Sequence, residues 1–105
     1  MSLQAIILSL LDGISDPLIR SDIASTIYFL RDMYISGRIS NDELKAELTN
    51  IVNEILDATQ PDLLPDEKKK KVDMLANQLF RAIKMETLRR RMYTKYRPSY
   101  RSLPT

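Results

Sequence analysis

Apolar side chains recur every three or four positions along most of this chain, which is the spacing of one face of an α-helix. The first such run covers residues 3–14, and the second covers residues 17–36. Asp16, followed directly by a proline, favours a helix start because its carboxylate can accept from free N–H groups. Gly13 lies near the end of the first run, and we expect it to end that helix in the left-handed conformation. Gly37 follows the second run, and we expect it to stop the second helix.

A third helix is expected over residues 41–58 and a fourth over residues 66–96. Ser40 and Glu43 have the spacing of a capping box, in which each side chain satisfies a backbone N–H group of the other residue. Pro98 ends the fourth helix, because the residue before a proline disfavours helical geometry. Each expected helix has one apolar stripe that should face the core. In chain order, the four stripes are Leu3, Ile6, Ile7, Leu10, Leu11 and Ile14; Ile19, Ile23, Ile27, Leu30 and Tyr34; Leu44, Leu48, Ile51, Val52, Ile55 and Leu56; and Val72, Leu75, Ala76, Leu79, Phe80 and Ile83.

These elements predict an all-α fold with a four-helix arrangement. Three shorter helices form an acidic body over residues 1–60, and residues 61–65 form a proline-containing connection. Residues 66–105 supply a long basic helix and a short extended tail within the same domain. The apolar stripe thins in the second half of the long helix, so we expect that half to project from the bundle. A core of this size is small, and a dimer or a larger assembly is expected.

The turn between the second and third helices has a recognisable pattern. It consists of Leu30, Met33, Gly37, the pair Ile39-Ser40 and the triplet Asp42-Glu43-Leu44. This pattern resembles the short helical hairpin of SHOCT-type domains and covers residues 30–48 of the 105. The resemblance implies a helix–turn–helix hairpin, and no function is carried over from it.

Charge is segregated along the chain. Residues 1–67 hold four basic and twelve acidic residues, a net charge of −8. Residues 68–105 hold twelve basic and two acidic residues, a net charge of +10, so the overall +2 conceals the division. A half this basic favours a polyanion or an acidic protein surface as partner.

The strongest candidate binding segment is the end of the long helix together with the tail. Arginine makes planar two-point contacts with phosphate, and tyrosine can stack on an exposed base. The predicted nucleic-acid-binding residues are Arg81, Lys84, Arg89, Arg90, Arg91, Tyr93, Lys95, Tyr96, Arg97, Tyr100 and Arg101. The leading hypothesis is a non-enzymatic protein that binds the phosphate backbone of DNA or RNA without reading sequence.

Two other interpretations of this segment stay open. The chain could be an accessory subunit that docks on an acidic protein, either within replication or transcription machinery or within a homo-oligomeric assembly. The charges could instead form a solvated helix end that complements the negative helix dipole. The run of residues 68–71, four lysines, is a second possible phosphate contact, although a solvated face explains it as well.

Catalytic and metal chemistry are disfavoured. The chain has no histidine and no cysteine, which removes the commonest general base and all thiolate ligands. Glu43, Glu47 and Glu54 lie at helical spacing with Asp57 nearby, but a polar outer face explains them fully. We predict no enzyme activity, no cofactor, no metal site and no small-molecule substrate.

The membrane is also disfavoured as a partner. No apolar stretch approaches the roughly 20 residues of a spanning helix, and the first helix lacks the lysine and arginine that bind anionic lipid. We therefore expect the apolar face of the first helix to join the core or a homotypic interface. An intracellular, cytoplasmic location is expected by default.

Overall fold

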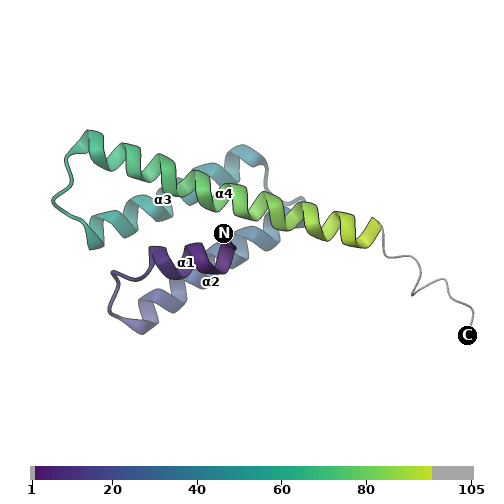
Figure 1. Ribbon diagram of the computed structural model, residues 1–105, viewed down its shortest axis with the longest axis horizontal. Coiled ribbons are helices and arrows are strands. Elements are labelled where there is room, and N and C mark those ends of the chain that lie inside the picture. Colours follow the sequence, from purple (N-terminus) through teal and green to yellow (C-terminus); the bar gives the residue numbers. More distant parts are fainter. Residues whose placement is uncertain (1, 96–105) are drawn as a thin grey trace, which may run out of the picture.

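The computed structural model describes residues 2–95 and contains four α-helices and no strand within that range. These are α1 (Leu3–Leu10), α2 (Pro17–Ile35), α3 (Asn41–Thr59) and α4 (Pro65–Lys95). The all-α prediction with a long fourth helix is confirmed. Figure 1 shows α3 and α4 side by side, with α1 and α2 on one side of this pair.

The helix starts follow the local chemistry of the sequence. The Asp16 carboxylate accepts from Leu18 N–H at 2.9 Å, with proline at the first position of α2. Ser40 and Glu43 form the expected capping box, with both hydrogen bonds at 3.1 Å. Each cap satisfies backbone donors that have no partner inside the helix, and a cap of this kind stabilises by about 1 kcal/mol.

The core is one cluster to which all four helices contribute. Helix α3 supplies its deepest part, because Leu44, Leu48 and Val52 are completely buried. Opposite them, Leu79 and Ile83 of α4 are also fully buried. The α3–α4 pair is therefore the framework of the fold, and α1 lies against α4.

The end of the first helix differs from the prediction. Helix α1 stops at Leu10, and the chain turns through Leu11 so that Ile14 N–H bonds to Leu11 O at 3.0 Å. Ile14 is still buried, but from the turn and not from a helix. The left-handed conformation expected at Gly13 is wrong, since Gly37 alone among the described glycines has a positive φ, of 78°.

A different constraint explains Gly13. A Cβ atom at this position would lie 3.0 Å from Cγ2 of Thr59, at the end of α3. Glycine lets the turn after α1 approach α3 this closely without displacing the Thr59 side chain. The residue at this position is therefore explained by a tertiary contact and not by a left-handed backbone.

The apolar stripe of α2 is only partly used. Ile27 and Leu30 are buried, but Ile19 is 48% exposed, although the pattern placed it in the core. Leu18 and Phe29 are also exposed. Helix α2 therefore lies against the bundle along part of its length and leaves apolar surface uncovered.

The last turns of α4 extend beyond the other helices, as expected (Figure 1). With 31 residues, α4 is about 46 Å long. Its last buried residues are Ile83 and Thr87, and all residues after Thr87 are exposed as far as Lys95. The hydroxyl of Thr87 donates to Ile83 O at 2.8 Å, so this buried polar group is satisfied.

Candidate binding surface on the last helix

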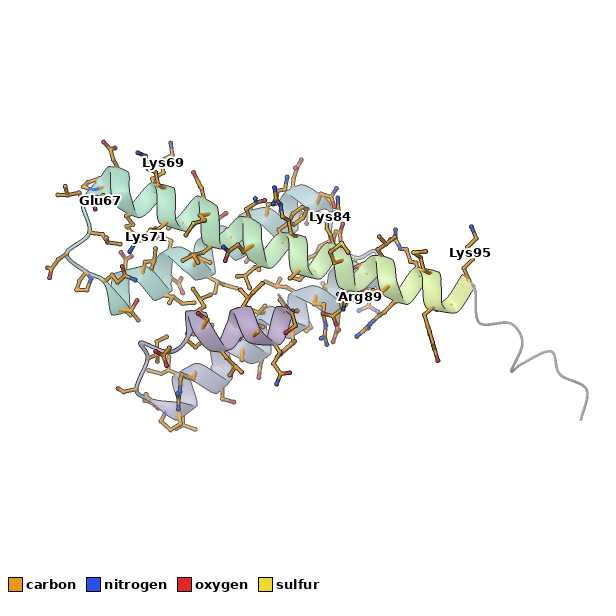
Figure 2. The ribbon with its side chains drawn as sticks, in the orientation of Figure 1. Glu67, Lys69, Lys71, Lys84, Arg89 and Lys95 are labelled. Atoms are coloured by element: carbon orange, nitrogen blue, oxygen red, sulfur yellow. The ribbon has the colours of Figure 1, made fainter. Side chains whose placement is uncertain are left out.

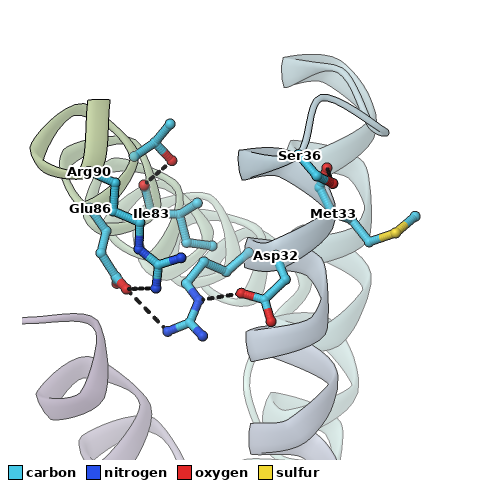
Figure 3. Close-up of polar contacts among 8 residues, drawn as sticks. Asp32, Met33, Ser36, Ile83, Glu86 and Arg90 are labelled. Atoms are coloured by element: carbon cyan, nitrogen blue, oxygen red, sulfur yellow. Dashed lines mark hydrogen bonds and ion pairs between the residues drawn. The ribbon is translucent and has the colours of Figure 1, made fainter. Parts of the chain in front are cut away.

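The three consecutive arginines of α4 point in different directions, because successive helical residues are separated by about 100°. Arg90 turns toward the bundle, where its Nη2 lies 3.5 Å from Oε1 of Glu86, one turn earlier (Figure 3). Arg89 and Arg91 are exposed, and neither forms an ion pair with any described residue. The three predicted phosphate ligands are therefore not equivalent, since Arg90 is already engaged.

Glu86 joins α4 to α2. The same Oε1 atom accepts from Nη1 of Arg31 at 3.1 Å, and Nε of Arg31 donates to Asp32 at 3.0 Å (Figure 3). The guanidinium of Arg31 also lies over the ring of Tyr28, 4.8 Å from its centre. Arg31 is 19% exposed and held on three sides. No pattern in the sequence pointed to this residue, because nothing local links it to a glutamate 55 positions away.

An open groove of about 900 Å³ lies between α1, α2 and α4. Its charged lining consists of Arg31, Arg81, Arg89 and Glu86, which is a net charge of +2. Its uncharged polar lining comes from Ser2, Gln4, Ser9, Tyr28 and Gln78. The structure thus brings the predicted residues Arg81 and Arg89 together on one concave basic surface, which we call the basic groove.

Lys84 lies on the other side of α4 from Arg89 (Figure 2). Its Nζ is 5.4 Å from the centre of the Phe80 ring, and Nζ of Lys45 is 4.8 Å from the same ring. The two cations share one ring, so Lys84 lies on the side of α4 that Lys45 of α3 contacts. Lys84 is therefore separated from the arginines of the basic groove, although it remains exposed.

Apolar side chains run along the outer, exposed side of α4, and the first of them, Met85, also lines the basic groove. Met85, Leu88 and Met92 are about half exposed and are spaced by three and four residues, so they share one side of the helix. Arg81 and Lys95 lie at the two ends of this outer stripe, by the same helical periodicity. The projecting half of α4 is therefore amphipathic, with an apolar centre and basic flanks.

The remaining predicted residues divide into two groups. Tyr93 and Lys95 are exposed on the last described turn, where Figure 2 shows Lys95 at the end of the helix. Tyr96, Arg97, Tyr100 and Arg101 lie outside the described residues.

The run of four lysines divides as well. Lys68 pairs with Asp57 of α3, and Nζ of Lys71 donates to the Gln60 side chain at 2.7 Å. Lys69 and Lys70 are exposed, and Lys69 extends away from α3 (Figure 2). Two of the lysines thus fasten α4 to the end of α3, and the other two face solvent.

Within residues 2–95, no three acidic side chains gather in a way that could hold a metal ion. None of the four described helices combines the length and apolar character needed to cross a bilayer.

Comparison with known proteins adds no relative. No family model, no curated protein and no solved structure matches this chain. The resemblance of residues 30–48 to a SHOCT-type hairpin is therefore without support from a family match. The surface on α4 has to be interpreted from its own chemistry.

Proposed function

We propose that this protein binds nucleic acid through the phosphate backbone, using the projecting end of α4 and the basic residues that follow it. The observation that carries this proposal is the set of exposed guanidinium groups without an acidic partner among the described residues: Arg81, Arg89 and Arg91. Asp73 and Glu86 are the only acids in residues 68–105, and Glu86 is occupied by Arg31 and Arg90. Phosphate therefore meets little competition on this surface.

The basic groove supports the same function. Arg81 and Arg89 are eight residues apart, so their backbone positions differ by about 12 Å along the helix axis. Two cations at this separation beside a concave wall suit an extended polyanion better than a single small anion. Contacts of this kind position a backbone but carry no sequence information, so we expect binding to depend little on base sequence.

The tyrosines contribute a second type of contact in this proposal. Tyr93 is 62% exposed beside Arg89 and Arg91 in the sequence. An exposed ring among arginines can stack on an unpaired base, which favours single strands over duplex. Tyr96 and Tyr100 would extend this contact along the tail.

The test is a filter-binding titration of the full chain with duplex DNA, single-stranded DNA and RNA at several salt concentrations. With about five phosphates neutralised, log affinity for duplex should fall against log salt with a slope of about −4.5. Arg89→Ala should weaken binding to all sequences and reduce the magnitude of this slope by about 1.

The matched control is Arg90→Ala, which removes the same charge from the neighbouring residue that pairs with Glu86. We expect Arg90→Ala to leave the slope nearly unchanged. Equal effects of the two substitutions would refute the assignment of separate roles to them. Undiminished retention of an Arg89→Ala/Arg91→Ala variant at low salt would refute the proposed function itself.

A second candidate function is an accessory subunit that docks on an acidic protein. One observation favours it, namely the exposed outer stripe of Met85, Leu88 and Met92. Phosphate contacts have no use for apolar side chains, whereas helix-in-groove recognition depends on them. Stoichiometric recovery of one protein with this chain after nuclease treatment would support this candidate.

A further inference from the structure

The end of the molecule opposite the projecting arm carries an apolar groove. It has a volume of about 410 Å³ and lies between the start of α2 and the end of α3. Its lining is Ile14, Ile19, Asp22, Ile23, Thr26, Ile51, Glu54, Ile55 and Ala58. The two charged residues in this lining are both acids, so we call it the acidic-rimmed groove.

The groove and the arm have complementary surfaces. The outer stripe of α4 is an apolar line on a helix with basic flanks, and the groove is an apolar channel with an acidic rim. Amphipathic helices bind such channels through side chains at i, i+3 and i+7, which is the spacing of Met85, Leu88 and Met92. The opposite charges would set the orientation of the helix and repel a nucleic acid from the groove.

We propose that the projecting end of α4 from a second copy of this chain docks in the acidic-rimmed groove. This inference rests on the second candidate function and names its partner. The arm cannot reach the groove of its own molecule, because the start of α2 and the end of α3, which line the groove, lie at the opposite end of the molecule from the projecting end of α4 (Figure 1). The net charges of −8 for residues 1–67 and +10 for residues 68–105 would draw unlike ends of two copies together.

The contact joins two different surfaces, so it is heterologous. Each copy offers one arm and one groove, and copies can therefore join as a closed ring, as a reciprocal pair or as an open chain. One helix in one groove makes a small interface, so we expect association that depends on concentration and weakens with salt.

The experiment measures the mass of nuclease-treated full chain by sedimentation from about 10 µM to about 1 mM, a range suited to small interfaces. The first variant, Asp22→Arg/Glu54→Arg, reverses the rim. The second, Arg89→Glu/Arg91→Glu, reverses the two exposed arginines that lie on either side of the outer stripe by helical periodicity. Each variant alone should lose at least about tenfold in self-association. All four side chains are exposed and none has an ion pair among the described residues, so both variants should fold.

Mixing the two variants is the decisive measurement. The reversed arm of one should fit the reversed groove of the other, so an equimolar mixture should associate although each variant alone does not. The control is Asp73→Arg, which reverses one exposed acid of α4 outside the groove, half the charge change of the rim variant, and should leave association unchanged. A monomeric wild type throughout the range, or a mixture that stays monomeric, overturns the proposal.

The same variants separate this inference from nucleic-acid binding. The rim carries none of the proposed phosphate contacts, so the Asp22→Arg/Glu54→Arg variant should be retained on nucleic acid at least as well as the wild type. Undiminished self-association of that variant would overturn the docking proposal and leave the nucleic-acid proposal standing. If the rim variant loses self-association and the wild type is not retained on nucleic acid, the docking proposal stands and the nucleic-acid proposal fails.

Discussion

The two halves of α4 both carry apolar side chains at helical spacing, but those of the first half are buried and those of the second half are exposed. In the first half, Val72, Ala76 and Leu79 repeat every three or four residues and are buried against α3. In the second half, Leu88 and Met92 are again four residues apart, but they lie on the other side of the helix from this buried stripe and remain about half exposed. The comparison shows that an apolar stripe predicts a helix, whereas burial also requires a neighbouring element. A stripe without a neighbour in its own molecule indicates a surface for a partner.

The largest expected difference between the two halves concerns stability. Leu79→Ala should lower the free energy of unfolding by about 2–5 kcal/mol, because it leaves a cavity in a fully buried position. Leu88→Ala should change it by less than about 0.5 kcal/mol, because this side chain is 48% exposed. Urea denaturation at a low protein concentration measures both values. Comparable losses for the two variants would show that the projecting half is buried in solution.

The next effect is expected at the boundary between the halves. Glu86→Gln removes the carboxylate that holds Arg31 of α2 and Arg90 of α4, both partly exposed. We expect a loss of about 1 kcal/mol at low salt, and a smaller loss at high salt. The same change releases two guanidinium groups, so nucleic acid should be bound more tightly.

Arg90→Ala provides the control for Glu86→Gln. It removes only the pair within α4, and we expect a loss below about 0.5 kcal/mol. Calorimetric unfolding of both variants at two salt concentrations distinguishes the contact between helices from the contact within α4. A larger loss for Arg90→Ala than for Glu86→Gln would contradict the central position given to Glu86.

The smallest expected effect lies at the start of α4. Lys68→Ala removes the pair with Asp57 and should cost about 0.5 kcal/mol at low salt. Lys69→Ala, one residue later on an exposed position, should cost nothing measurable. Thermal unfolding in low and high salt checks this pair of variants. Equal behaviour at both salt concentrations would show that Lys68 does not fasten α4 to α3.

Several parts of the fold follow directly from neighbouring residues. The capping box of Ser40 and Glu43 was predicted and is present, and the second helix ends before Gly37 as predicted, where the glycine has a positive φ. These features depend on hydrogen bonds and backbone angles within a few positions, so local chemistry is sufficient to specify them. The prediction for Gly13 was wrong because its role depends on Thr59, which is distant in sequence.

The candidate surface shows the same division. The concentration of arginine near the end of α4 was evident in the composition of that segment, whereas the difference between Arg89 and Arg90 was not. Arg31 was placed in the basic groove by packing of α2 against α4, which no spacing rule predicts. Ile19 was expected in the core, but the angle at which α2 lies leaves it in the wall of an open groove.

The sequence by itself determined the helices, most of their caps and the separation of negative from positive charge, because these depend on residues a few positions apart. The tertiary structure alone decided which cations are already paired and which apolar side chains stay uncovered. Those properties depend on contacts between distant segments, such as the one between Arg31 and Glu86. Two surfaces of opposite charge at opposite ends of one bundle arise only when the four helices are packed together.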